Sequence, residues 1–241
     1  MANQPPKIKV IEGFLPPEDC AWLIAQSKEA NLWSISNDIG DSIVEPELRK
    51  DYKLQWDDRI IDLHRLYDRK IEPELMSRTW DILSRSKTEL FNFFELSGEI
   101  YLDSWEVVRW FPPISQNPHL DFIEPDFDRT KDFPEGFDHS YFTEEAERMY
   151  RLYNTTKHYT TMLYLNEDFE GGEIYFPQYG DFDIKPKPGM LVIFSGDFHH
   201  LHGVREIKKG VRYTNTAFWS RYPTFTTVAR ELRDGIFKPY W

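Results

Sequence analysis

The sequence predicts a mainly β protein with flanking α-helices: a jelly roll of two face-to-face sheets, braced by helices near the N-terminus. Beyond residue 98, short segments rich in β-branched and aromatic side chains follow one another, with Pro and Gly between them. Before residue 98, apolar residues recur at helical spacing over long stretches. The chain has 241 residues with 18 Phe, 13 Tyr and 8 Trp, which is enough for a substantial core.

Residues 1–98 are expected to form mainly helical support for the sheets. Glu18 and Asp19 suit the first turn of a helix, where acidic side chains favour the helix dipole. Leu75, Leu83 and Leu90 fit a buried helical stripe, for which core packing is the favoured interpretation. In chain order we expect a strand at 7–14, a helix from Pro16-Pro17 to about Ala30, a loop at 31–43, a strand at 48–56, and helix over 57–96 broken near Pro73.

Residues 99–221 are expected to form the jelly-roll core. Turn signals such as Gly171-Gly172 and Pro188-Gly189 separate its apolar segments. The expected strands are 101–111, 159–165, 173–176, 181–185, 191–195, 201–205 and 211–220.

The strand pattern is interrupted by an acidic and aromatic insert at 123–156, in which Thr143 is placed to cap a short helix. Two interpretations of the insert stay open: a solvated surface excursion, or a lid or substrate-binding loop. Residues 222–241 are expected to form a C-terminal tail with a short helix from Phe225. We expect residues 1–241 to make up a single domain.

The composition of the chain disfavours several kinds of partner and excludes some kinds of site. The net charge is −12 and no run is rich in Lys or Arg, which disfavours nucleic acid and an anionic membrane surface as partners. A basic or neutral substrate fits this balance. Cys20 is the one cysteine, so an intrachain disulfide and a cysteine-based zinc site are excluded. The N-terminal residues do not have a signal-peptide core and no run has membrane-spanning length, so we expect a soluble, cytoplasmic protein.

A metal site is predicted from His119-Leu120-Asp121 together with a histidine far downstream. If residues 119–121 form a strand, His119 and Asp121 point to the same side. The third ligand is chosen as His202; His200 has the same parity on a strand and remains the alternative. Two imidazoles and one carboxylate on one face of Fe(II) leave other positions open, which predicts a non-haem iron oxygenase.

Arg212, ten residues after His202, is a candidate anchor for an acidic cosubstrate. An α-keto acid can take two of the open iron positions and dioxygen the third. A guanidinium offers a two-pronged donor that matches the distal carboxylate. Thr214, two residues on, faces the same way along a strand.

At this point the chain resembles the prolyl 4-hydroxylase-like branch of the Fe(II)/2-oxoglutarate dioxygenases, from about residue 9 to residue 220. The resemblance rests on several motifs in order. They are the segment Lys9–Cys20, His119-Leu120-Asp121, residues 161–166 (TMLYLN), Glu170-Gly171-Gly172-Glu173 leading to Phe176-Pro177, residues 185–189 (KPKPG), and His202 with Arg212.

The resemblance implies a double-stranded β-helix, another name for this jelly roll, with iron held by His119, Asp121 and His202. It implies that Arg212 pairs with the far carboxylate of 2-oxoglutarate, with Tyr164 and Thr214 in the same pocket. Two departures stand out. Trp110 occupies a position where relatives usually have a tyrosine, and its indole N–H is the available replacement donor. Residues 111–118 replace the usual glycine-rich approach to the first histidine.

The resemblance therefore implies a dioxygenase that uses Fe(II), 2-oxoglutarate and O2, with ascorbate as an auxiliary reductant, and releases succinate and CO2. The expected substrate is a protein or peptide containing proline. Alternatives are another side chain, a free amino acid or a small molecule; a non-catalytic jelly-roll binding module; and a cupin-like enzyme with another metal.

Overall fold

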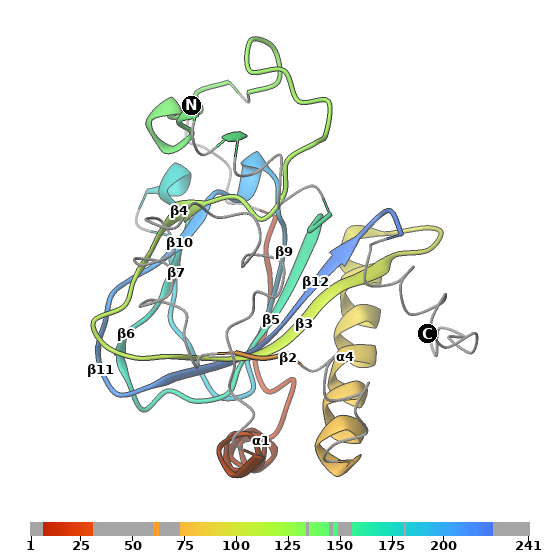
Figure 1. Cartoon of the computed structure of the whole chain (residues 1–241), viewed down its shortest axis with the longest axis vertical. Helices are drawn as coiled ribbons and strands as arrows, with labels where there is room; N and C mark the ends of the chain where they lie inside the picture. Colours follow the sequence, from red (N-terminus) through yellow and green to blue (C-terminus); the bar gives the residue numbers. More distant parts are fainter. Residues whose placement is uncertain are drawn as a thin grey trace.

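The computed structural model describes residues 7–30, 60–62, 73–133, 135–144, 147–148, 156–180 and 182–223. Their main feature is a pair of sheets that face each other and enclose a barrel (Figure 1). The larger sheet has six strands in the order β1 (Lys9–Ile11), β9 (Leu191–Ser195), β5 (Tyr159–Tyr164), β12 (Arg212–Ser220), β3 (Tyr101–Trp110) and β2 (Ile60–Asp62). The smaller sheet has the order β4 (Gln116–His119), β10 (His202–Val204), β7 (Ile174–Tyr175) and β8 (Asp183–Ile184).

A further pair joins β11 (Ile207–Lys209) to β6 (Glu170–Gly171). Neighbouring strands pair antiparallel in both large sheets, as the short strands and frequent turns predicted. The jelly-roll prediction is confirmed.

Two helices cover the outer face of the larger sheet: α1 (Pro17–Ala30) and α4 (Pro73–Phe94). Leu75, Leu83 and Leu90 of α4 are at most 1% exposed and belong to the same core as Trp105 and Trp219. The predicted helical stripe is therefore core packing. None of the helices in the described ranges is both long and apolar enough to cross a membrane.

The two-residue period of β5 determines which of its side chains face the barrel interior. Leu163 points into the core beneath the helices, whereas Met162 and Tyr164 join the interior cluster with Phe176 and Phe194. Every residue of β5 is buried, because one face meets the helices and the other meets the barrel interior. Side chains of the same parity as Tyr164 therefore line the barrel.

Two parts of the strand and helix prediction are wrong: the structure assigned to residues 60–62, and the absence of β6 and β11. Residues 60–62 were expected to be helical but form β2, in which the β-branched Ile60 and Ile61 pair with Val108 and Val107 at the edge of β3. Strands β6 and β11 were not predicted, since each is only two or three residues long. The expected strand at 48–56 and the expected helix after residue 225 lie outside the described residues.

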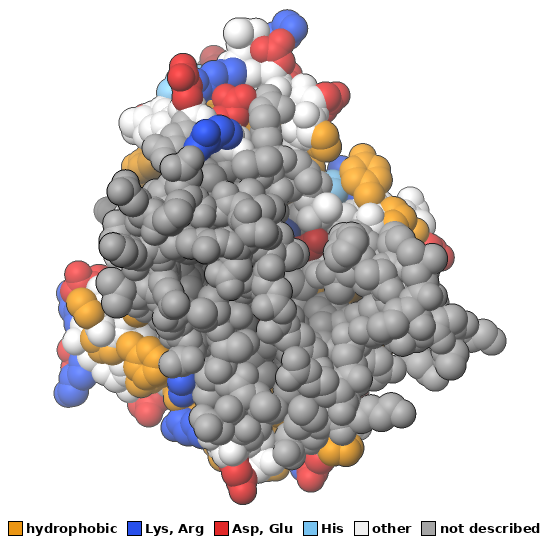
Figure 2. All heavy atoms as spheres, in the orientation of Figure 1, with side chains coloured by type: hydrophobic (Ala, Val, Ile, Leu, Met, Phe, Trp, Pro, Cys, Tyr) orange, Lys and Arg blue, Asp and Glu red, His pale blue; other side chains and the backbone are white. Residues whose placement is uncertain are grey.

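The insert contains a core of its own at the top of the molecule (Figure 1). Its buried rings are Phe127, Phe137 and Phe142, and they pack with Phe198, which lies between β9 and β10. The described part of the insert is therefore more than a solvated surface excursion. Figure 2 shows acidic and basic side chains interspersed at this end. Some acids of the insert are ion-paired within it; Arg129, for example, pairs with Glu144 and Glu147.

Candidate metal centre and cosubstrate pocket

The structure brings His119, Asp121 and His202 together at one end of the smaller sheet. Strand β4 ends at His119 and β10 begins at His202, and these two residues are direct partners across the strand pair. Asp121 Oδ1 lies 3.7 Å from His119 Nε2, and Asp121 Oδ2 lies 3.8 Å from His202 Nε2. One ligand atom from each residue lies within 4.8 Å of the others, a spacing suited to a single metal ion.

The reason for this convergence differs in part from the prediction. Asp121 lies beyond the end of β4, so strand alternation does not set its direction. Instead, the Phe122 amide donates to the Gly196 carbonyl at 2.9 Å and ties the segment to the turn after β9. A Cβ on Gly196 would lie 2.9 Å from the Asp121 Cβ, so a side chain at position 196 would push Asp121 away.

In both imidazoles Nδ1 lies against a backbone carbonyl, and Nε2 is the ring nitrogen that faces the cluster. His119 Nδ1 lies 3.0 Å from the Asn117 carbonyl oxygen, and His202 Nδ1 lies 2.8 Å from the His200 carbonyl oxygen. Because a carbonyl only accepts, Nδ1–H is the donor in each ring and the Nε2 lone pair faces the cluster. Burial lowers the pKa of His202 to about 4, with the neighbouring His119 acting in the same direction, so this imidazole is neutral near pH 7.

Histidines 199 and 200 point elsewhere, although sequence parity had kept His200 as an alternative. Residues Phe198–His200 form a 3-10 turn, so strand parity does not extend from His202 back to His200. His200 Nδ1 lies 2.7 Å from the Ser195 hydroxyl, and its ring packs near Phe194. His199 is exposed.

Thr160 is a site residue that the sequence reasoning missed. Its hydroxyl donates to Asp121 Oδ2 at 2.6 Å, and the side chain is buried on β5. Thr160 has the same parity as Tyr164, and this two-residue spacing was the available signal.

Replacing Thr160 with Val is expected to weaken metal binding about 10- to 100-fold, because an outer hydrogen bond that orients a ligand is lost while the volume is kept. Titration of the apo protein with Fe(II) under anaerobic conditions measures this change. Thr160→Ser keeps the hydroxyl and should restore most of the affinity. Equal affinities for wild type and Thr160→Val would show that this hydrogen bond does not position Asp121.

Arg212 lies inside the barrel and is 1% exposed. Its terminal nitrogen lies 3.4 Å from the Tyr164 hydroxyl and 3.5 Å from Met162 Sδ. No carboxylate among the described residues pairs with Arg212, and its buried Nε has no hydrogen-bond partner there. A buried cation without a counterion is costly, so this arrangement fits an anion from outside the chain.

The other predicted pocket residues surround Arg212. Thr214 is 1% exposed and pairs across the sheet with Tyr164 on β5. Trp110 is the β3 partner of Arg212, and the guanidinium carbon lies 5.5 Å from the Trp110 ring centroid. Burial raises the pKa of Tyr164, so its hydroxyl stays protonated and can donate.

The chain is similar to known proteins in sequence and in fold. A family model described as the 2OG-Fe(II) oxygenase superfamily matches residues 115–220. Prolyl 3-hydroxylase 2 of Homo sapiens is 33% identical over 86 residues, which is 34% of this chain. The matched part is only 12% of the length of that relative.

Two solved structures show the same fold. The viral collagen prolyl hydroxylase from Paramecium Bursaria Chlorella virus-1 has a TM-score of 0.57 at 17% identity, covering 89% of this chain and 95% of that one. A prolyl hydroxylase from Trichoplax adhaerens, in complex with a hypoxia inducible factor oxygen degradation domain peptide fragment, has a TM-score of 0.53 at 13% identity. That match covers 90% of this chain and 84% of the other.

Proposed function

Because residues 115–220 match the family model of the 2OG-Fe(II) oxygenase superfamily, we propose that this chain is an Fe(II)- and 2-oxoglutarate-dependent dioxygenase. The reaction is hydroxylation of a C–H bond, with release of succinate and CO2. The proposed substrate is a prolyl residue in a peptide or protein.

The observation that carries the proposal is the convergence of His119, Asp121 and His202. Two imidazole nitrogens and one carboxylate oxygen are a donor set that suits Fe(II) and leaves coordination positions open. These residues fit the metal, because both Nε2 lone pairs face the carboxylate and both Nδ1 atoms are held by backbone carbonyls. When bound with 2-oxoglutarate, Fe(II) supplies the activation of dioxygen.

The cosubstrate is assigned to Arg212 and Tyr164. Arg212 would bind the far carboxylate of 2-oxoglutarate with its two-pronged guanidinium, and the Tyr164 hydroxyl would donate to the same carboxylate. Phe194 and Phe176, whose ring centroids lie 4.8 Å and 6.0 Å from that of His202, exclude water from this side of the metal. Trp110 is the proposed wall behind the guanidinium.

The proline assignment is supported by similarity to prolyl 3-hydroxylase 2 and by a fold shared with prolyl hydroxylases, one of them bound to a peptide fragment. Another side chain, a free amino acid or a small molecule is an alternative outcome of a substrate screen.

Purified protein with Fe(II), ascorbate and 2-oxoglutarate is expected to form succinate, slowly alone and faster with a proline-containing peptide. Succinate is quantified by mass spectrometry, and the peptide is scanned for a gain of one oxygen. Absence of succinate with every peptide tested, and without peptide, would refute the oxygenase assignment. Succinate without oxygen in any prolyl residue would refute only the proline assignment.

A further inference from the structure

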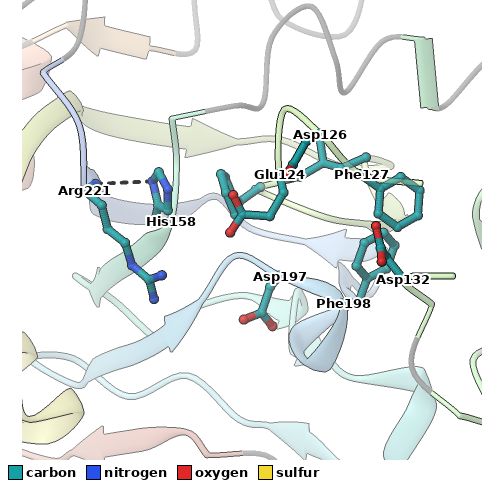
Figure 3. A pocket seen from close by; sticks show the side chains of 10 residues that line it. Glu124, Asp126, Phe127, Asp132, His158, Asp197, Phe198 and Arg221 are labelled. Atoms are coloured by element: carbon teal, nitrogen blue, oxygen red, sulfur yellow. Dashed lines mark hydrogen bonds between the residues drawn. The ribbon is translucent and has the colours of Figure 1, made fainter. Parts of the chain in front are cut away.

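A pocket of about 360 Å³ lies next to the proposed iron ligand Asp121. Phe122, the next residue along the chain, lines it. Asp197 lines it from the turn after β9, and the Phe122-to-Gly196 hydrogen bond joins these two segments. Figure 3 shows Glu124 and Asp197 between Arg221 and His158 on one side and Phe127 and Phe198 on the other. The pocket and the proposed metal site therefore share the same two backbone segments.

Charge in this pocket is strongly negative. Its acidic lining residues are Glu124, Asp126, Asp132 and Asp197, against the single cation Arg221. The Arg221 guanidinium already forms hydrogen bonds within the chain. Its Nε and one terminal nitrogen donate to the Tyr159 hydroxyl at 2.9 Å and 2.6 Å.

Two of these carboxylates, Glu124 and Asp126, form no ion pair within the part of the chain that the structure describes. Both side chains are exposed. Asp197 differs from Glu124 and Asp126, because its oxygens accept hydrogen bonds from the Ser195 hydroxyl and the His199 amide. Burial alone would raise the pKa of Asp197, but the hydrogen bond and charge of His200 and the His199 amide outweigh it, so the pKa is lowered.

His158 is an independent indication of a ligand with N–H donors. It lines the pocket, is 3% exposed, and its buried Nε2 has no hydrogen-bond partner among the described residues. His158 Nδ1 lies 3.0 Å from the Thr156 carbonyl oxygen and 3.3 Å from the Arg221 amide nitrogen. The shorter contact requires a proton on Nδ1, so Nε2 carries a lone pair that can accept. Burial lowers the pKa of His158, and the imidazole therefore adds no positive charge.

The aromatic lining suits the stem of a long basic side chain. Phe122, Phe127 and Phe198 line the pocket, and the Phe127 and Phe198 rings are stacked with centroids 4.9 Å apart. Lys and Arg side chains bury their methylene stems on apolar surface while the charged end reaches polar groups. Rings also attract a nearby ammonium or guanidinium.

We propose that this pocket binds a Lys or Arg side chain of the peptide substrate, close in sequence to the residue that is hydroxylated. The proposal rests on the proposed function, because it requires that the peptide substrate passes along the segment after Asp121 on its way to the proposed iron site. It names a basic peptide as the substrate class.

The test uses fluorescein-labelled peptides of Gly, Ser and one central Pro, flanked by two Lys, two Arg, two citrulline or two Glu. Binding to the full chain is measured by fluorescence anisotropy with Fe(II) and 2-oxoglutarate under anaerobic conditions. The Lys and Arg peptides are expected to bind about tenfold more tightly than the citrulline peptide, and this preference should shrink as salt is raised. The double variant Glu124→Gln/Asp126→Asn should lose most of the preference.

The matched control is Glu135→Gln, which removes an exposed acid of the same insert that does not line the pocket. It should keep the preference for basic peptides. Equal binding of basic and citrulline peptides would overturn the proposal. Equal loss in Glu135→Gln and in the double variant would also overturn it, because the effect would then belong to the overall charge of −12.

Two further measurements separate the possible causes of failure. Succinate formation without peptide is measured in the wild type, and its absence there would count against the proposed function and not against the pocket. Spermidine is tested as a competitor of the Arg peptide. If spermidine binds in a way that depends on Glu124 and Asp126 while the basic peptides do not, the ligand is a polyamine and the peptide assignment is overturned.

Discussion

Replacing His202 with Ala is expected to abolish succinate formation and to lower Fe(II) affinity by at least about 100-fold, since even outer-shell partners of a ligand contribute 10- to 100-fold. His202 is the β10 member of the cluster, and its Nε2 lies 3.8 Å from Asp121 Oδ2. The remaining pair, His119 and Asp121, cannot hold the ion on one face. Iron content after anaerobic reconstitution and succinate yield are the two measurements.

His199→Ala is the matched control, because it removes an exposed imidazole three residues away. It should keep both iron and turnover. His200→Ala tests the alternative ligand that the sequence left open, and it too should retain iron, since its ring contacts Ser195 and lies outside the cluster. Full iron content in His202→Ala, or its loss in His200→Ala alone, would reverse the ligand assignment.

The second large effect is expected at Arg212. Replacing it with Ala should raise the KM for 2-oxoglutarate on the order of 100-fold, about 3 kcal/mol, because a buried charge-assisted pair is lost. Turnover at saturating cosubstrate should fall less than kcat/KM, since the metal ligands are untouched. Arg212→Lys keeps the charge without the two-pronged geometry and should lie between wild type and Ala.

Arg205→Ala is the control for Arg212. Arg205 is an exposed arginine that forms two 3.0 Å hydrogen bonds with Asp183 at the surface. Thermal unfolding with and without 2-oxoglutarate gives a readout independent of activity. The stabilisation by 2-oxoglutarate should vanish in Arg212→Ala and persist in Arg205→Ala. A 2-oxoglutarate shift of wild-type size in Arg212→Ala would contradict the assignment.

Much of the barrel could be predicted because its strands are bounded by Gly and Pro and differ sharply from the helical region. The segments around Tyr159, Leu191 and Arg212 were found within one or two residues. The prediction for residues 60–62 was wrong because they lie within the longer stretch 57–96 that was expected to be helical, and only their pairing with β3 identifies a strand.

The residues of the candidate site likewise divide into those that the sequence predicted and those that it did not. His119, Asp121 and His202 were found from spacing and from resemblance, although the strand argument for Asp121 does not hold in the structure. Thr160 was missed, because its two-residue spacing from Tyr164 places it on the barrel face of β5 but does not show which carboxylate it meets. That no carboxylate of the described residues pairs with Arg212 could not be seen in the sequence either, because it depends on what the fold places near the guanidinium.

The aromatic core of the insert has a consequence for how specificity can diverge in this fold. Phe198 belongs to that core and also lies four residues before His202, so it links the insert to β10. Phe198 contacts four aromatic rings of the insert, those of Phe127, Phe133, Phe137 and Phe142. Leu120 and Leu201, which neighbour the proposed iron ligands, belong to the same core, so an exchanged insert is expected to keep the proposed iron site in place only if it restores this packing.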